Sequence, residues 1–309
     1  MPTDAFAPSS DRRSASGLLA VLVATLSYGS ITTLSRLAYD DGTTAITIVA
    51  IRNAVFVLGF GAWMIAMRGG FALPRRAWYA SLFLGLLMAL WGYGYMASVA
   101  YIPVSLAALL YFTFPLLVGV IAAVAGQERM TLIRALALLI AFAGLALALG
   151  PAWDGLDWRG VALVMMGSVT CAIAHVFVAP IFRDYDIVAI NFLAHLWMVI
   201  GFAIYGIAMH EFVMPRSTEG QFIVMAVVLF YILAYTLWSV AIRWIGPVRT
   251  AGMMNLEPIV SVAAAALILG ERLGPVQLAG CGLVLLALMI VARHRGTRRS
   301  TALVVRPQK

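Results

Sequence analysis

The sequence predicts an all-α integral membrane protein with ten transmembrane helices, arranged as two inverted five-helix repeats. Three observations lead to this fold class. Hydrophobic residues make up 63% of the 309 residues and charged residues 11%, which leaves too little polar surface to cover a water-soluble globule. Ten apolar runs are each about twenty residues long, enough to cross a bilayer core of about 30 Å. The two halves of the chain also carry the same motif at a fixed offset.

The ten runs are joined mostly by short connections, so there is no room for a separate soluble domain. The expected spans cover residues 17–38, 44–67, 77–98, 103–125, 131–150, 160–182, 187–209, 220–242, 248–269 and 274–292.

The repeated motif is a proline followed, thirteen residues later, by a Glu-Arg pair. It occurs at Pro115 with Glu128 and again at Pro258 with Glu271, an offset of 143 residues. Five spans per half is an odd number, so the second half must enter the membrane from the opposite side. The repeats are then inverted, and the seam between them is where such proteins keep their binding site.

The net charge of +8 does not indicate a nucleic-acid-binding protein, because the basic residues are sorted by side of the membrane. If the N-terminus is cytoplasmic, sixteen Lys and Arg residues fall on the cytoplasmic side: 12, 13, 68, 75, 76, 129, 134, 183, 243, 249, 293, 295, 298, 299, 306 and 309. Only Arg36, Arg159, Arg216 and Arg272 fall on the other side. This positive-inside bias predicts that both termini are cytoplasmic.

Two stretches resemble the EamA-type transporters of the drug/metabolite transporter superfamily, a likeness that covers roughly residues 17–292. The first comprises Tyr101–Tyr111, Phe114-Pro115 and Gln127-Glu128-Arg129; the second comprises Gly246-Pro247-Val248, Asn255-Leu256-Glu257-Pro258 and Gly270-Glu271-Arg272-Leu273. Gln127 departs from the family pattern, which usually has Gly before Glu, and should loosen that turn. The resemblance implies efflux of small metabolites, amino acids or amphipathic compounds across a bacterial inner membrane.

The expected organisation follows from these boundaries. Residues 1–16 form a disordered cytoplasmic N-terminus, 17–150 the first EamA-like repeat, 151–159 a periplasmic linker, 160–292 the second repeat and 293–309 a basic cytoplasmic tail.

Pro115 and Pro258 fall near the middle of the expected fourth and ninth helices. Proline removes a backbone donor and clashes with the preceding turn, so both helices should kink. The kinks are either packing features or paired hinges beside a central cavity, and their symmetric placement favours hinges. Glu128-Arg129 and Glu271-Arg272, at the membrane ends, are expected to cap turns rather than bind substrate.

Glu257 is the only carboxylate far from a membrane surface, about 15 Å deep at 1.5 Å per residue. A charge there is costly and usually functional, so Glu257 is a candidate proton-coupling or cation-binding site; the alternative is a neutral acid that braces the kink. Arg52 is about 12 Å deep, too far for its side chain to reach the headgroups. It should either pair with Asp40, Asp41 or Glu257, or bind a substrate carboxylate.

His175 and His195 also lie within apolar runs, and the repeat offset sets His195 opposite Arg52. Either histidine could relay protons, although a hydrogen-bonded packing role is the common alternative. No cluster has metal-ligand spacing, so no metal is expected. The two cysteines, Cys171 and Cys281, are interpreted as small core residues.

Aromatic residues form helical stripes on the expected third and eighth helices, both free of internal charges. Such stripes are ordinary core or, on helices that the family places around its cavity, an apolar wall with hydrogen-bonding groups. We expect the cavity to be lined by Trp91, Tyr95, Tyr111, Tyr235, Trp238 and Asn255.

A secondary transporter that works by alternating access is therefore the leading function, with small-molecule substrates, the lipid bilayer and, as one alternative, protons as coupling ions. No cofactor is expected, and no nucleotide-binding loop is present to supply ATP energy. The quaternary state is a monomer or a homodimer. The alternative is a membrane-embedded enzyme acting on a lipid or apolar substrate, but the sequence lacks the His-Glu-x-x-His and Gly-x-Ser-x-Gly motifs. A passive channel is disfavoured by the bulky aromatic residues.

Overall fold

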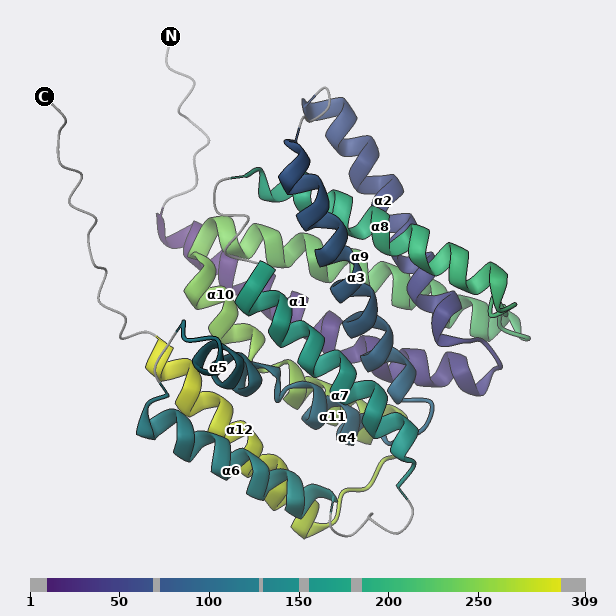
Figure 1. Cartoon of the computed structure of the whole chain (residues 1–309). Helices are drawn as coiled ribbons and strands as arrows, with labels where there is room; N and C mark the ends of the chain where they lie inside the picture. The colour runs from purple at the N-terminus through teal and green to yellow at the C-terminus, as the bar shows by residue number, and fades with distance from the viewer. Residues whose placement is uncertain (1–9, 69–72, 128–129, 150–155, 179–184, 296–309) are drawn as a thin grey trace, which may run out of the picture.

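A computed structural model describes residues 10–68, 73–127, 130–149, 156–178 and 185–295 (Figure 1). Every regular element within these ranges is a helix, as the composition predicted. In chain order they are α1 (Ser10–Asp40), α2 (Ala45–Arg68), α3 (Arg75–Ser98), α4 (Val104–Tyr111), α5 (Phe114–Val124), α6 (Leu132–Leu149), α7 (Trp158–Ile173), the π-helical turn η2 (Ala174–Val178), α8 (Ile187–Ala208), α9 (Thr218–Ile245), α10 (Pro247–Met254), α11 (Glu257–Ile268) and α12 (Pro275–Arg295).

Eight helical stretches in the described ranges are long and apolar enough to cross a membrane, when α4 is counted with α5 and α10 with α11. The apolar parts of α6 and α12, Leu132–Ala148 and Pro275–Val291, are shorter. The all-helical membrane class is therefore confirmed, with eight full-length candidate spans and two shorter apolar helices where ten spans were expected.

Three predicted boundaries need correction. Residues 10–16, expected to be disordered, form the first turns of α1, because no proline or glycine follows Pro8 until Gly17. The expected linker ends early, since the Asp157 carboxylate accepts the Arg159 N–H at 2.8 Å and starts α7 at Trp158. Residues 293–295 belong to α12. Residues 1–9, residues 151–155 of the linker, residues 296–309 of the basic tail and the Glu128-Arg129 pair lie outside the described residues.

The two predicted kinks are complete helix breaks. Phe112 and Thr113 separate α4 from α5, and Asn255 and Leu256 separate α10 from α11. Each proline is the second residue of the following helix, where its missing N–H has no intrahelical partner to lose. We call these interruptions the first break (residues 112–113) and the second break (residues 255–256).

Helices pack in pairs that join distant parts of the sequence. α1 packs along α9, α3 packs along α7 and α8, α2 along α8, and α6 along α12. The pair α6 and α12 lies side by side at one edge of the molecule (Figure 1). The two helices approach each other closely at Gly144 and Gly280. A Cβ on Gly144 would lie 2.7 Å from the Gly280 carbonyl oxygen, so this close approach requires glycine.

The sequence offset is also the offset of the helices. α3 and α9 begin at residues 75 and 218, α4 and α10 at 104 and 247, α5 and α11 at 114 and 257, and α6 and α12 at 132 and 275. Each pair of first residues is 143 apart, the separation of Pro115 and Pro258. These four pairs of helices therefore start in the same register, whereas α7 begins 148 residues after α1 and α8 begins 142 residues after α2.

The turn after α5 shows how Gln127 is accommodated. Gly126 takes the left-handed conformation (φ 69°), as Gly270 does after α11 (φ 67°). α5 ends one residue earlier than the repeat register requires, so a glycine still follows the helix and the Gln127 N–H bonds the Ala122 carbonyl at 2.9 Å. The glycine has thus moved by one position, and the expected loosening at Gln127 stays a prediction.

Candidate functional site

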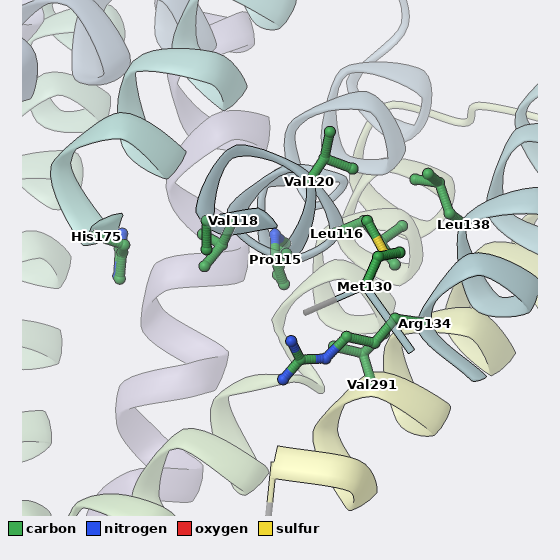
Figure 2. A pocket seen from close by; sticks show the side chains of 11 residues that line it. Pro115, Leu116, Val118, Val120, Met130, Arg134, Leu138, His175 and Val291 are labelled. Carbon is green, nitrogen blue, oxygen red and sulfur yellow. The ribbon is translucent and has the colours of Figure 1, made fainter. Parts of the chain in front are cut away.

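A pocket of about 290 Å³ opens beside the first break. Its walls are residues of α5, α6 and α12, and Figure 2 shows His175 on one side of it and Arg134 and Met130 on the other. Most of the lining is aliphatic, and Arg134 supplies a cationic group. Two predicted site residues, Pro115 and His175, therefore meet at one pocket, which could hold an apolar molecule with a polar end.

A row of rings leads from this pocket into the protein. The His175 ring lies 5.5 Å from Phe114, Phe114 lies 5.6 Å from Tyr111, and Tyr111 stacks on Tyr95 at 4.2 Å with an angle of 2° between the ring planes. The Tyr111 hydroxyl also lies 3.7 Å from Cys171 Sγ. The structure thus brings together three of the predicted site residues, on η2, α4 and α3.

A second polar cluster surrounds Arg52 on α2. The Arg52 guanidinium carbon lies 4.7 Å from the centre of the Tyr231 ring on α9. His195 on α8 is fully buried; its Nδ1 bonds the Asn191 carbonyl oxygen at 2.7 Å and its Nε2 lies 3.1 Å from the Tyr231 hydroxyl. Arg52 and His195, which the repeat offset aligns, therefore both contact Tyr231.

None of the acids proposed as partners for Arg52 pairs with it. Asp40 is bound to Arg36 at 3.3 Å, and the Asp41 carboxylate accepts the Ser217 N–H at 3.0 Å. Arg52 forms no hydrogen bond or ion pair with Glu257 or with any other described residue, and its Nε is buried without a partner. An uncompensated charge in the interior costs several kcal/mol. The prediction that Arg52 forms an ion pair with Asp40, Asp41 or Glu257 is therefore wrong in this structure.

Asn255 lies in the second break and Glu257 directly follows it, and both are half-buried. Glu257 is the first residue of α11 and forms no hydrogen bond with a described side chain, so it does not brace the break through one. Its carboxyl group is within electrostatic range of Tyr28, Tyr95 and Tyr111. Tyr28 on α1 is within electrostatic range of both Arg52 and Glu257.

The proposed cavity wall is only partly assembled. Tyr235 and Trp238 contact each other on α9 at 5.7 Å between ring centres, and Tyr235 meets Phe56 at 4.6 Å. Trp91 is half-buried where α3 packs on α7. None of the six predicted wall residues lines the pocket beside Pro115 or a smaller one of about 140 Å³ near Glu271. Their role in a substrate cavity stays a prediction.

Several polar residues of these clusters were not singled out from the sequence. Tyr28 packs against Tyr231, whose hydroxyl lies 3.4 Å from Asn53 Oδ1, and the hydroxyl oxygens of Thr32 and Ser261 are 3.0 Å apart. A polar residue inside an apolar run is the signal that could have found them. Among the described residues, no group of three His, Cys, Asp or Glu side chains could hold a metal ion.

Glu271 performs the capping role predicted for it, but on the other half of the chain. Its carboxylate accepts the backbone N–H of Val104 at 2.7 Å and of Ser105 at 3.1 Å, together with the Ser105 hydroxyl. These contacts cap buried N–H groups at the start of α4, which have no partner within their own helix. Glu271 thereby ties the end of α11 to α4.

Comparisons with known proteins agree with the fold. The model of the EamA-like transporter family matches residues 15–150 and again residues 158–293. An "Uncharacterized transporter" of Archaeoglobus fulgidus is 27% identical over 202 residues, which cover 63% of this chain and 70% of that protein. The "Uncharacterized transporter YcbK" of Bacillus subtilis is 41% identical over 68 residues, 22% of each chain.

A solved crystal structure of a protein 17% identical in sequence shares the fold, with a TM-score of 0.60 over 91% of this chain and 99% of that one. The apolar helices and the two family matches together make this a multi-pass membrane protein of a transporter family. The chain belongs to the EamA-like transporter family.

Proposed function

We propose that the protein is a secondary transporter that exposes one central site alternately to the two sides of the membrane. In this proposal α6 and α12 also cross the bilayer, so that the ten spans form two inverted repeats, residues 17–150 and 160–292. The shared register of the helix starts supports this arrangement. So do the packing pairs: α1 with α9 corresponds to α7 with α3, and α1 with α11 corresponds to α7 with α5.

One asymmetry in this packing carries the proposal. α4 packs against α11, and the corresponding pair in the other half would be α10 against α5. No comparable packing joins α5 to α10 among the described residues. Glu271 ties the α4 end closed, while the pocket beside Pro115 opens along α5. A carrier built of inverted repeats has this asymmetry when it is closed at one end and open at the other. If α10 packed against α5 and α4 separated from α11, the central site would open to the other side of the membrane.

The sidedness of the proposal rests on the arginine distribution. The Arg134 end is cytoplasmic and the Glu271 end faces outward, with both termini cytoplasmic in a bacterial inner membrane. The pocket would then open inward. A membrane-impermeant thiol reagent applied outside should modify a cysteine placed at Asp154 and spare one placed at Arg298. The reverse labelling would overturn this orientation.

The substrates are small metabolites, amino acids or amphipathic compounds, moved outward down their own gradient or by proton exchange. The row of rings from His175 to Tyr95, ending near Glu257, supports a path for a molecule with an apolar body. Glu257 is the proposed coupling residue because it is the deep carboxylate without a described partner.

A binding screen followed by a flux assay tests the function. Ligands that bind the folded state raise its apparent Tm by mass action, so a thermal-shift screen of small metabolites identifies a substrate. In proteoliposomes that substrate should show saturable uptake accelerated by unlabelled substrate inside. Uptake that rises linearly with concentration, without counterflow, would indicate a channel and contradict the proposal.

A further inference from the structure

Arg52 stands out as a deeply buried cation that the described protein does not neutralise. Its side chain is 6% exposed, its Nε has no hydrogen-bond partner, and its two other nitrogens form no hydrogen bond with a described residue. The aromatic face of Tyr231 is the contact that the structure offers it. A cation–π contact weakly compensates a buried charge, which normally requires an anion with hydrogen bonds.

The surrounding hydrogen bonds show which donors remain available. Because His195 Nδ1 faces the Asn191 carbonyl oxygen, it donates, and Nε2 of the neutral ring is then an acceptor. The Tyr231 hydroxyl lies 3.1 Å from this Nε2 and 3.4 Å from Asn53 Oδ1, so its single proton is shared between two acceptors of the cluster. The Asn53 amide donates to the Val49 carbonyl oxygen. Both groups are therefore used within the cluster.

The Arg52 guanidinium and the Tyr28 hydroxyl are donors that form no hydrogen bond with a described residue. Tyr28 packs edge-on against Tyr231 at 6.2 Å between ring centres and is within electrostatic range of Arg52. The Tyr231 ring covers one face of the guanidinium, which leaves its edge for an anion. Near Nη2 the chain has Gly92, whose missing Cβ would lie 3.5 Å from that nitrogen.

We propose that Arg52 and Tyr28 form a binding site for the carboxylate group of an organic anion with an apolar or aromatic body. This inference deepens the proposed transport function and rests on it. The guanidinium edge matches the two oxygens of a carboxylate. A single negative charge is favoured, because Arg52 and the neutral imidazole of His195 are the basic groups that the described interior brings to this cluster. Phe56 and Tyr235, packed at 4.6 Å, supply the apolar wall.

The test uses binding to the purified full-length protein in nanodiscs, without any gradient or flux. Hippurate is the probe, its neutral amide N-benzoylglycinamide is the matched control, and phenyl phosphate is the doubly charged alternative. Hippurate should bind saturably and raise the apparent Tm, and the amide should not. Arg52→Met should weaken hippurate binding by about tenfold or more, because charge-assisted hydrogen bonds are lost.

Stability without ligand gives an independent readout. Removing an unpaired buried charge should raise the apparent Tm of Arg52→Met. The control Arg36→Met should instead lower it and leave hippurate binding unchanged, because Arg36 is bound to Asp40 and to the Val99 carbonyl oxygen.

The outcomes are decisive in both directions. Absence of hippurate binding, equal binding of the amide, unchanged binding to Arg52→Met, or a lower Tm for that variant would overturn the site. Tighter binding of phenyl phosphate than of hippurate would show that the site prefers a phosphoryl group, and would overturn the proposed carboxylate class of ligand. Because transport is not measured, each of these results leaves the flux test of the transporter unaffected.

Discussion

The two helix breaks occupy the same place in the two halves of the chain but differ in environment. At the first break every residue of α4 before Tyr111 is buried, and the Thr113 hydroxyl bonds the Leu110 carbonyl at 2.7 Å and lies 3.0 Å from the Ser168 hydroxyl. At the second break Leu256 is 40% exposed, and neither Asn255 nor Glu257 has a side-chain hydrogen bond with a described residue.

The repeat register makes the difference specific, because Phe114 and Glu257 are equivalent positions. After the first break comes Phe114, whose ring belongs to the row from His175 to Tyr95. After the second break comes Glu257, an acid without a hydrogen bond to a described side chain. A shared motif therefore fixes where the helices break, while the flanking residues decide whether the break is packed or polar. We infer that the packed break is structural in this state and that the polar break carries the coupling.

Glu257→Gln should have the largest effect, because it removes the titrating group from the second break. Proton-driven accumulation of a substrate in proteoliposomes should be abolished, while counterflow of the same substrate continues. Glu219→Gln, at an exposed acid on α9, should keep both activities. Accumulation by the Glu257 variant with its full dependence on a pH gradient would show that the acid has no coupling role.

Glu271→Ala should have the largest effect on stability, because it removes the carboxylate that holds the start of α4. The loss of a helix cap and of charge-assisted hydrogen bonds predicts a free energy of unfolding lower by ~2 kcal/mol. Glu271→Gln keeps one acceptor and should fall between this variant and the parent. Apparent Tm values of the three proteins, measured in one detergent, check this order. An unchanged Tm for the alanine variant would show that Glu271 does not hold the α4 end closed.

Thr113→Val and Asn255→Ala compare the breaks directly. Thr113→Val loses the bond to the Leu110 carbonyl and leaves Ser168 without that partner, at a cost of about 1–2 kcal/mol. Asn255→Ala should change stability by no more than about 0.5 kcal/mol, because no described hydrogen bond is lost. Equal destabilisation by the two changes would mean that the second break is as tightly bonded as the first.

Gly126→Ala and Gly270→Ala should have the smallest and most similar effects. Both glycines have positive φ and open space where a Cβ would go, so strain in the left-handed conformation is the cost, about 1 kcal/mol each. Thermal unfolding of both variants measures this. A much smaller effect at Gly126 would show that the turn near Gln127 is looser after all.

Local chemistry made the breaks predictable, and long-range packing limited the rest. Pro115 and Pro258 mark the breaks because proline lacks an N–H, and the repeat offset predicted that Arg52 and His195 correspond. The bond from Glu271 to Val104 joins residues 167 positions apart, and nothing local in either segment indicates it. Tyr95 and Tyr111 were both expected to line a cavity, but their stacking on each other depends on how α3 meets α4.

Pulsed electron paramagnetic resonance distances between mirrored positions test most directly whether the two ends exchange their packing. Tyr101 and Leu267 flank the packed α4 and α11 pair; their equivalents, 143 residues away, are Trp244 and Val124 beside α10 and α5. All four are exposed, at 44%, 85%, 48% and 85%. With Cys171 and Cys281 replaced by alanine, the 101–267 distance should be the shorter without substrate. Adding substrate should lengthen it and shorten 124–244; two distances that stay fixed or move together would contradict alternating access.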